Sequence, residues 1–435
     1  MTQNALVFGG GGARGAYEIG VWKALRELEI EFSIVTGTSV GALNGALFAQ
    51  GDYDKAEALW SEIDTPQVLR LSEDDDITEA TKLLATAKTY LQNVHKYRSV
   101  GLDTSPLLEL ITAHVDENAV RRSPILFGLT TVMLDGKSSE AKEYFIDQIP
   151  QGQLHQYLMA SSALFPALAY QLIDGKIHVD GGYHDNVPTN MALNRGAEMT
   201  LSVDLNAVGI DLEPKPSIGQ RCELIRPCHD LGPVLNFTKE QSRRNIRLGY
   251  LDAMKHYGRY RGRYFTFLPT AFCRISPHDR SKLKETARLL RCEERNPLGK
   301  LSASTLRREI TKRCSGDPQI PETLFFAGAE AVGKIFGAEP TRVYSEEAYL
   351  SAIQRSVREY VLHRKTMDEF GFNRRKTIQK TIETLDDKGT VTILCRQLKS
   401  VSRGGSRAKL RALASLRPDE FLAAVFLWVS GIKIK

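Results

Sequence analysis

The sequence predicts an α/β fold around a mainly parallel sheet, followed by a mostly helical C-terminal region. Two observations predict this architecture. Short apolar runs alternate with segments of helical periodicity through the first 205 residues, as in chains that build a parallel sheet. Beyond residue 267 the periodicity is mostly helical. At 435 residues, the chain is long enough for two or three domains.

The N-terminal elements alternate in type. Residues 5–8 are an apolar run that stops at four glycines, as expected for a buried strand that ends in a tight loop. Apolar side chains recur at helical spacing over residues 16–29. Residues 33–36 predict a second buried strand, and residues 39–50 predict a helix of small residues that ends at Gly51.

The following segment, residues 52–122, is predicted to be helical, with Ser105 as an N-cap and Pro106 in the first helical turn. The remaining strands of the sheet are expected at residues 125–134, 143–146, 177–179 and 200–205.

Charge is distributed unevenly along the chain. The formal net charge is +6, yet residues 1–214 carry −14 and residues 215–314 carry +14. Such a change often marks a domain or surface boundary. We therefore expect two domains, at residues 1–268 and 269–435, and assign no role to the second.

The first of these domains is expected to have two parts, a core at residues 1–205 that holds the motifs below and a basic helical segment at residues 215–268.

Composition excludes several protein classes. With 42% hydrophobic and 25% charged residues, the chain is neither disordered nor collagen-like. The six cysteines lie in the second half without a C-x-x-C pair, which argues against a zinc site or a secreted disulfide framework. The N-terminus lacks the features of a secretion signal. We expect a cytoplasmic protein without a metal or organic cofactor, and the sequence carries no signal for an oligomeric state.

A glycine-rich loop follows the first strand. Gly10, Gly12 and Gly15 satisfy G-x-G-x-x-G, and glycine lets successive backbone N–H groups converge on an anion. That anion is either a dinucleotide pyrophosphate or the oxyanion of an acyl-transfer intermediate. A tight turn without a ligand is the third interpretation.

A second motif, G-x-S-x-G, spans residues 37–41 between a predicted strand and a predicted helix. This context is typical of a nucleophile elbow, which lifts the serine hydroxyl, here that of Ser39, clear of the sheet. The alternative is that Ser39 only caps the helix. A third motif, Asp180-Gly181-Gly182, follows the predicted strand at residues 177–179, although Asp-Gly is also a common turn dipeptide.

Together the three motifs resemble the patatin-like phospholipase family, in the form of a bacterial-type patatin domain with a C-terminal extension. The family combines G-G-G-x-[KR]-G, G-x-S-x-G and D-G-[AG], which match residues 10–15, 37–41 and 180–182 here. The resemblance covers about the first 205 residues, including residues 161–166. It implies a three-layer fold and a dyad of Ser39 and Asp180 that needs no histidine.

Ester cleavage by a serine also has requirements that do not depend on the family. The hydroxyl needs a base within hydrogen-bonding reach, and the developing O⁻ needs donors. We expect Ser39 to be the nucleophile and Asp180 the base. A Ser-His-Asp triad with His178 or His184 is the competing arrangement.

The amides of Gly10, Gly11 and Gly12 are the expected oxyanion donors, and Arg14 is expected to brace the glycine loop. The glycines expected to support the three turns are Gly15, Gly37, Gly41, Gly181 and Gly182.

The predicted function is a lipid acyl hydrolase of the phospholipase A or lysophospholipase type, a serine esterase acting on membrane phospholipids. One rival is an idle lipid-binding or scaffolding protein. The other is a nucleotide-binding protein, which would need an acidic residue after the second strand, where the chain has residues 36–39, Thr-Gly-Thr-Ser.

The basic segment at residues 239–264 has three interpretations. The first is an amphipathic helix packed on the catalytic domain, and the second is a peripheral contact with anionic lipid headgroups. Nucleic-acid binding is not expected, since no nucleic-acid fold signature accompanies the segment. Residues 421–432 predict a buried terminal helix, and the acidic run at residues 73–76 lacks the spacing of a calcium loop.

Overall fold

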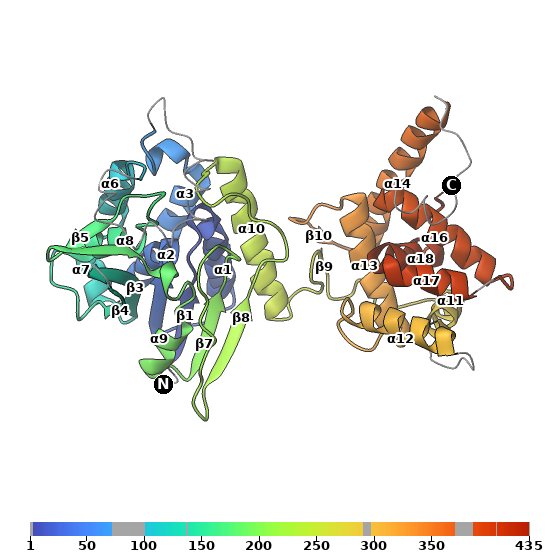
Figure 1. Cartoon of the computed structure of the whole chain (residues 1–435), viewed down its shortest axis with the longest axis horizontal. Coiled ribbons are helices and arrows are strands. Elements are labelled where there is room, and N and C mark those ends of the chain that lie inside the picture. The colour runs from blue at the N-terminus through green and yellow to red at the C-terminus, as the bar shows by residue number, and fades with distance from the viewer. Residues whose placement is uncertain are drawn as a thin grey trace. The chain divides into compact units, whose positions relative to one another are not determined.

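The computed structural model describes residues 3–71, 101–135, 138–289, 297–369, 386–405 and 407–434. The chain forms two compact units, Met1–Tyr257 and Gly258–Lys435 (Figure 1). The position predicted for the domain boundary, residue 268, falls inside the second unit. The acidic run at residues 73–76 lies outside the described residues.

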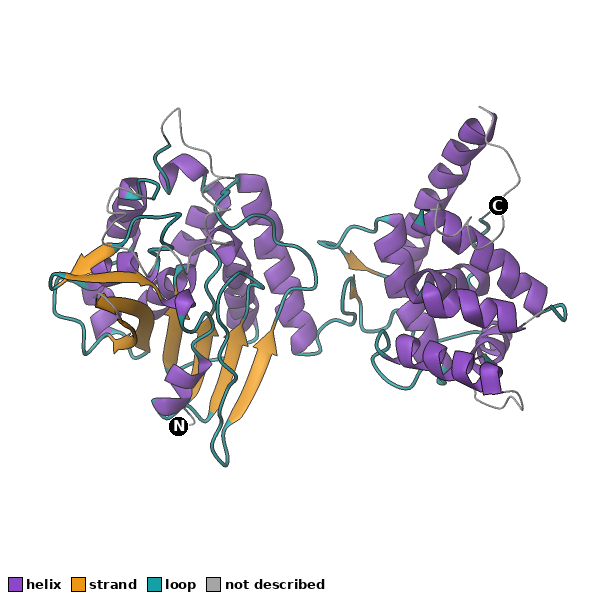
Figure 2. Ribbon diagram, viewed as in Figure 1, coloured by secondary structure: helices purple, strands orange, loops and turns teal. Residues whose placement is uncertain are grey.

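A mainly parallel sheet forms the centre of the first unit (Figure 2), which confirms the predicted fold class. The strand order is β5-β6-β3-β2-β1-β7-β8, and β4 pairs with β3. The neighbouring strands β3-β2-β1-β7-β8 are parallel, whereas β4 and β6 run antiparallel to β3. The strands are β1 (Asn4–Phe8), β2 (Ile34–Thr38), β3 (Leu126–Asp135), β4 (Ser138–Phe145), β5 (Gln171–Ile173), β6 (Lys176–Asp180), β7 (Met199–Val203) and β8 (Arg221–Ile225).

The register of the sheet brings distant segments together. Thr38 at the end of β2 pairs with Thr130 of β3, and Asp180 at the end of β6 pairs with Thr131. Because β6 runs antiparallel to β3, the ends of β2 and β6 meet across the middle of β3. The residues that follow these two strands therefore start from neighbouring positions.

Helices cover both faces of this sheet. On one face, Ala5 and Val7 of β1 pack in a cluster with Met191 of α9. On the other, Phe8 of β1 makes an edge-on contact with Phe48 of α2, with ring centroids 6.1 Å apart. The helices of this unit are α1 (Ala16–Glu27), α2 (Val40–Gln50), α3 (Tyr53–Glu62), α6 (Ser105–His114), α7 (Glu117–Arg122), α8 (Leu154–Ser161), α9 (Thr189–Asn194) and α10 (Lys239–His256).

Helix α10 packs against α1 at a very close crossing. A Cβ atom added at Gly20 of α1 would collide with the carbonyl oxygen of Ile246, and one at Gly249 would collide with that of Tyr17. The Tyr17 hydroxyl donates a hydrogen bond of 2.7 Å to Asp252. The part of the basic segment that forms α10, Lys239–His256, is therefore a helix packed on the first unit, as in the first interpretation, whereas residues 258–264 belong to the second unit.

The predicted elements differ from the structure in detail. Thr104, rather than Ser105, is the N-cap of α6, so that prediction is wrong by one residue. The strand expected at residues 143–146 begins already at Ser138. Strand β8 was not predicted, because an edge strand with Arg221 and Glu223 lacks the apolar run of a buried strand.

The second unit is a helical domain with its own core. Phe272, Phe325, Tyr349 and Phe426 form an aromatic cluster, and the terminal helix that contains Phe426 is almost entirely buried, as predicted. Two short strands, β9 (Thr266–Phe267) and β10 (Val343–Tyr344), pair in parallel. The helices of this unit are α11 (Pro277–Arg288), α12 (Pro297–Thr311), α13 (Pro321–Phe336), α14 (Glu346–Glu369), α16 (Asp387–Val401), α17 (Arg407–Leu416) and α18 (Pro418–Val429).

Over the described ranges of both units, no helix combines the length and the apolar character needed to cross a membrane.

Candidate active site

Ser39 occupies a strained turn between β2 and α2. Its backbone lies at φ 55° and ψ −127°, a region that side chains rarely adopt and that costs about 1–3 kcal/mol. Glycines flank it because a Cβ atom at Gly41 would lie 2.6 Å from the carbonyl oxygen of Gly9, and one at Gly37 would lie 2.6 Å from the amide of Ala42. Ser39 occupies the N-cap position of α2, but its hydroxyl makes no capping hydrogen bond, so the side chain does not serve as a cap.

Side chains on both sides of the turn hold it in place. The amide of Ser39 donates a hydrogen bond of 2.9 Å to the hydroxyl of Ser161, at the end of α8. The Thr38 hydroxyl donates to the carbonyl oxygen of Asp185 at 2.9 Å and lies 2.8 Å from that of Thr130. Ser161 belongs to the segment at residues 161–166, in which the sequence motifs indicate no individual role for any residue.

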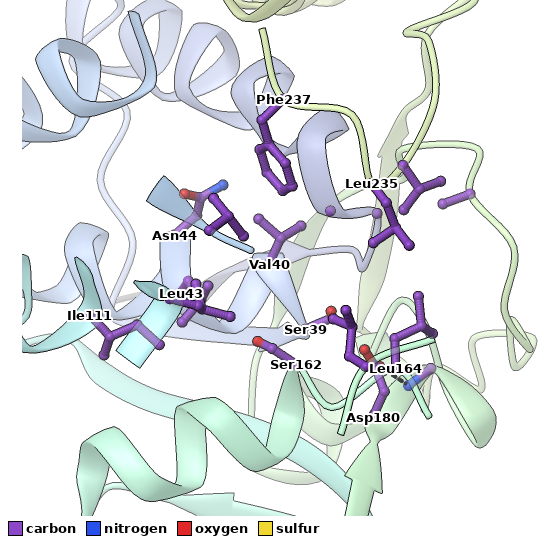
Figure 3. A pocket seen from close by; sticks show the side chains of 18 of the residues that line it. Ser39, Val40, Leu43, Asn44, Ile111, Ser162, Leu164, Asp180, Leu235 and Phe237 are labelled. Atoms are coloured by element: carbon purple, nitrogen blue, oxygen red, sulfur yellow. Dashed lines mark hydrogen bonds between the residues drawn. The ribbon is translucent and has the colours of Figure 1, made fainter. Parts of the chain in front are cut away.

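Asp180 ends β6 beside this turn, as Figure 3 shows. The residue is 2% exposed, and its carboxylate accepts a hydrogen bond of 2.8 Å from the amide of Gly182. Burial raises the pKa of Asp180 to about 6, although the Gly182 amide and the Ser39 hydroxyl both favour the ionised form. The Ser39 hydroxyl therefore has a carboxylate as its neighbour, with a pKa close to neutral pH.

The glycine-rich loop is fixed by backbone hydrogen bonds on either side of its centre. The amide of Gly10 donates to the carbonyl oxygen of Asn186 at 2.9 Å, and the amide of Ala13 donates to that of Val234 at 2.7 Å. Between them, Gly11 and Gly12 line the cavity beside Ser39. The predicted set of three donors is thus reduced to two, because the Gly10 amide is already engaged.

Arg14 links this loop to two others. Its guanidinium donates to the carbonyl oxygens of Gly232 at 2.8 Å, Asn206 at 2.5 Å and Leu205 at 3.3 Å. It also lies 3.9 Å from the exposed carboxylate of Asp230. The side chain therefore holds together three loops around the site, a bracing position like the one expected.

The two histidines of the competing triad lie elsewhere. His178 is buried within β6, where burial lowers its pKa, and it pairs with Met133 and Gln171 of the neighbouring strands. His184 is exposed, near Glu143. Among the described residues that line the cavity, the only histidine is His114, which is bonded to the Leu110 carbonyl oxygen of α6.

An apolar cavity of about 280 Å³ opens from Ser39 and Asp180. Figure 3 shows its aliphatic and aromatic walls. The polar Asn44 is held in the wall by hydrogen bonds to Glu18 at 2.7 Å and from the Trp60 indole at 2.9 Å. The apolar side chains of the wall include those of Val40, Leu43, Leu47, Ile63, Leu107, Ile111, Val115, Leu164, Leu168, Leu235 and Phe237.

No cluster of three or more potential metal ligands occurs among the described residues. Within the same ranges the cysteines are free thiols, at positions 222, 228, 273, 314 and 395.

A family model described as patatin-like phospholipase matches residues 6–193, the stretch that supplies Ser39, Asp180 and the glycine loop. These residues form a patatin-like phospholipase domain. The chain is 30% identical, over 212 residues, to patatin-like phospholipase domain-containing protein 7 of Rattus norvegicus, and the alignment covers 48% of this chain and 14% of that protein. It is also 27% identical, over 206 residues, to lysophospholipase NTE1 of Kluyveromyces lactis, and this alignment covers 47% of this chain and 12% of that protein.

The alignments with these two relatives therefore span only about a seventh of the relatives' own length. Among solved structures, the crystal structure of VipD from Legionella pneumophila aligns over 100% of this chain and 92% of its own, with 13% identity and a TM-score of 0.34.

Proposed function

We propose that this protein is a lipid acyl hydrolase of the phospholipase A or lysophospholipase type, which cleaves carboxylic esters of membrane phospholipids. One observation carries the proposal: Ser39 stands on a strained elbow beside the buried carboxylate of Asp180, at the edge of an apolar cavity. The patatin-like domain and the lysophospholipase among its relatives support the same class of reaction.

In the first step, the hydroxyl oxygen of Ser39 attacks the ester carbonyl carbon and its proton passes to Asp180. The carbonyl oxygen becomes the oxyanion of a tetrahedral intermediate and accepts hydrogen bonds from the amides of Gly11 and Gly12. When the C–O bond to the alcohol breaks, Asp180 returns the proton to the leaving oxygen. The products are a lysolipid or glycerol derivative and an acyl group esterified to Ser39.

In the second step, water attacks the acyl-serine while Asp180 accepts one of its protons. Collapse of the second tetrahedral intermediate releases the fatty acid, and the proton returns to the Ser39 oxygen. The dyad therefore ends each cycle unchanged, and Asp180 acts alternately as base and acid.

The cavity indicates what kind of acyl group is bound. Its walls are aliphatic and aromatic and Ser39 is one of the residues that line it, so a hydrocarbon chain is buried next to the ester it carries. These walls also argue against the nucleotide-binding interpretation of the glycine loop, since a dinucleotide needs polar partners for its ribose and base.

The test is covalent labelling and ester hydrolysis by Ser39→Ala. We expect labelling by a fluorophosphonate to disappear and the hydrolysis rate to fall by several orders of magnitude. Ser162→Ala is the matched control for labelling, because Ser162 also lines the cavity but its hydroxyl has no partner among the described residues. Stoichiometric labelling of Ser39→Ala would refute the proposal.

A further inference from the structure

A loop at the cavity mouth exposes aliphatic side chains. It follows β7, at the carboxyl end of the strand that pairs with β1. Val208 and Ile210 of this loop are 78% and 52% exposed, and both also line the cavity beside Ser39. Isolated exposed aliphatic residues are common on protein surfaces. These two differ because their apolar surface is continuous with that of the cavity.

The backbone of this loop is fixed against the catalytic segment. The Ile210 amide donates to the carbonyl oxygen of Gly182 at 2.9 Å, and the Ile210 carbonyl oxygen accepts from the amide of Asn186 at 2.6 Å. Two residues later, the amide of Leu212 donates to the carboxylate of Asp185 at 3.3 Å. The residues that follow Asp180 therefore hold the loop, and with it Ile210, at the cavity mouth.

We propose that Val208 and Ile210 form an apolar rim that docks onto the surface of a zwitterionic lipid bilayer, so that an acyl chain passes into the cavity without crossing water. This inference rests on the proposed function for the identity of the substrate. An acyl chain that leaves a bilayer exposes its hydrocarbon surface unless apolar protein surface replaces the lipid around it. The rim and the cavity wall provide that surface without a gap.

Charge favours a zwitterionic surface over an anionic one. The first unit carries 23 Lys and Arg residues against 33 Asp and Glu residues, and the exposed carboxylate of Asp230 stands near the same site. The basic side chains of α10 are engaged within the unit. Arg243 and Lys239 form ion pairs with Glu62, and Arg244 donates to the carbonyl oxygen of Asp230 at 2.8 Å. We therefore expect docking to depend little on salt.

The same loop supplies a matched control. Ile218 is fully exposed, but it lies just before β8, where Arg221 pairs with Met199 at the amino end of β7. Because β7 enters the sheet there and leaves it at the glycine loop, Ile218 is at the opposite end of the sheet from the cavity mouth. A lipid surface that covers the rim does not reach it.

The experiment measures co-sedimentation of the full chain with phosphatidylcholine vesicles, in a Ser39→Ala background so that hydrolysis plays no part. We expect V208D/I210D to bind at least fivefold more weakly than the parent, and I218D to bind equally well. Circular dichroism checks the fold, and V208S/I210S, with a smaller expected loss, replaces the aspartate variant if that one unfolds.

Several results would contradict the proposal that the rim docks onto a bilayer. One is that V208D/I210D binds the vesicles as tightly as the parent, and another is that I218D loses as much binding as V208D/I210D. The others are that the parent does not bind these vesicles, or that 0.5 M salt releases it from them. Because only binding is measured, failure of the rim leaves the proposed hydrolysis standing. Conversely, if the chain with Ser39 intact hydrolysed no phospholipid while the rim variants still lost vesicle binding, the proposed function would be refuted and the docking role of the rim would stand.

Discussion

The amide of Gly10 donates a hydrogen bond of 2.9 Å to the carbonyl oxygen of Asn186. This bond joins the loop after β1 to the segment that follows Asp180. The side-chain amide of Asn186 also reaches back to the carbonyl oxygen of Gly10, at 3.3 Å. The candidate oxyanion amides and the candidate base are thus parts of one hydrogen-bonded assembly, in which a shift of either segment displaces the other.

That rigidity makes Gly12 sensitive to substitution. Its φ is +53°, and a Cβ atom there would collide with the carbonyl of Val234. We expect Gly12→Ala to lower kcat by about 10²–10³, the usual effect of losing an oxyanion donor, because the loop has to move. Gly51→Ala is the control, since Gly51 also has a positive φ of 82° but has no atom within 4 Å of the added Cβ. Gly51→Ala should lower the free energy of unfolding by about 1–2 kcal/mol and leave the activity unchanged. Steady-state kinetics and thermal melts of both variants decide the matter, and equal activities would contradict the assignment.

The choice between dyad and triad is tested at three positions. Asp180→Asn keeps the shape of the side chain and its contact with the Gly182 amide but removes the proposed base, so kcat should fall by about 10³ or more. His178→Ala and His184→Ala should each stay within about tenfold of the parent, because neither histidine lines the cavity. A loss of about three orders of magnitude in a folded histidine variant would instead support the triad.

The pH dependence of the reaction follows from the burial of Asp180. Its pKa is raised from the ordinary value to about 6, so the carboxylate that we propose as the acceptor of the Ser39 proton predominates only above that pH. We expect kcat/KM to be nearly constant from pH 7 to 8 and to fall about tenfold per unit below pH 6.

A second buried carboxyl complicates this profile. Burial raises the pKa of Asp185 to about 7, and its carboxylate holds the amide of Leu212 in the loop at the cavity mouth. Asp185→Asn therefore serves as the control. If the fall in kcat/KM below pH 6 is caused by protonation of Asp180, it persists in Asp185→Asn. If kcat/KM of that variant is instead constant down to pH 5, the fall is caused by Asp185.

The sequence predicted the parts of the site that depend on short segments. The elbow at Ser39, the glycine loop and the strand end at Asp180 each consist of a few neighbouring residues whose types are dictated by local backbone geometry. Their meeting point follows from the sheet register, which pairs Thr38 with Thr130 and Asp180 with Thr131. The sequence motifs contain no signal for that register.

The contacts missed by sequence reasoning all join distant segments. The bonds from Gly10 to Asn186, from Ser39 to Ser161 and from Ile210 to Gly182 form only after the sheet has assembled. The Gly10 amide was expected to be an oxyanion donor because a glycine motif does not reveal which amide is already occupied. Periodicity, in contrast, was sufficient to identify α10 as a packed helix, since Ile246 and Met254 are buried as their spacing predicts.

The packing of α10 on α1 gives the last prediction. At Gly20 an added methyl group would overlap the carbonyl oxygen of Ile246 and lie 2.7 Å from the amide of Tyr250, both backbone atoms of α10. Neither can move without the helix, so Gly20→Ala must push α10 away from α1. Alanine favours an isolated helix by about 1 kcal/mol over glycine, yet we expect Gly20→Ala to destabilise the first unit by at least about 2 kcal/mol, because the crossing is lost.

The reciprocal variant, Gly249→Ala, tests the same crossing from the other helix. Its methyl group would overlap the carbonyl oxygen of Tyr17, and it should destabilise the unit by a similar amount. Since both substitutions disrupt one contact, the double variant should lose much less than the two separate losses combined. Urea unfolding of the four proteins measures this. If either single variant were more stable than the parent, helix propensity would dominate and α10 would not pack as described.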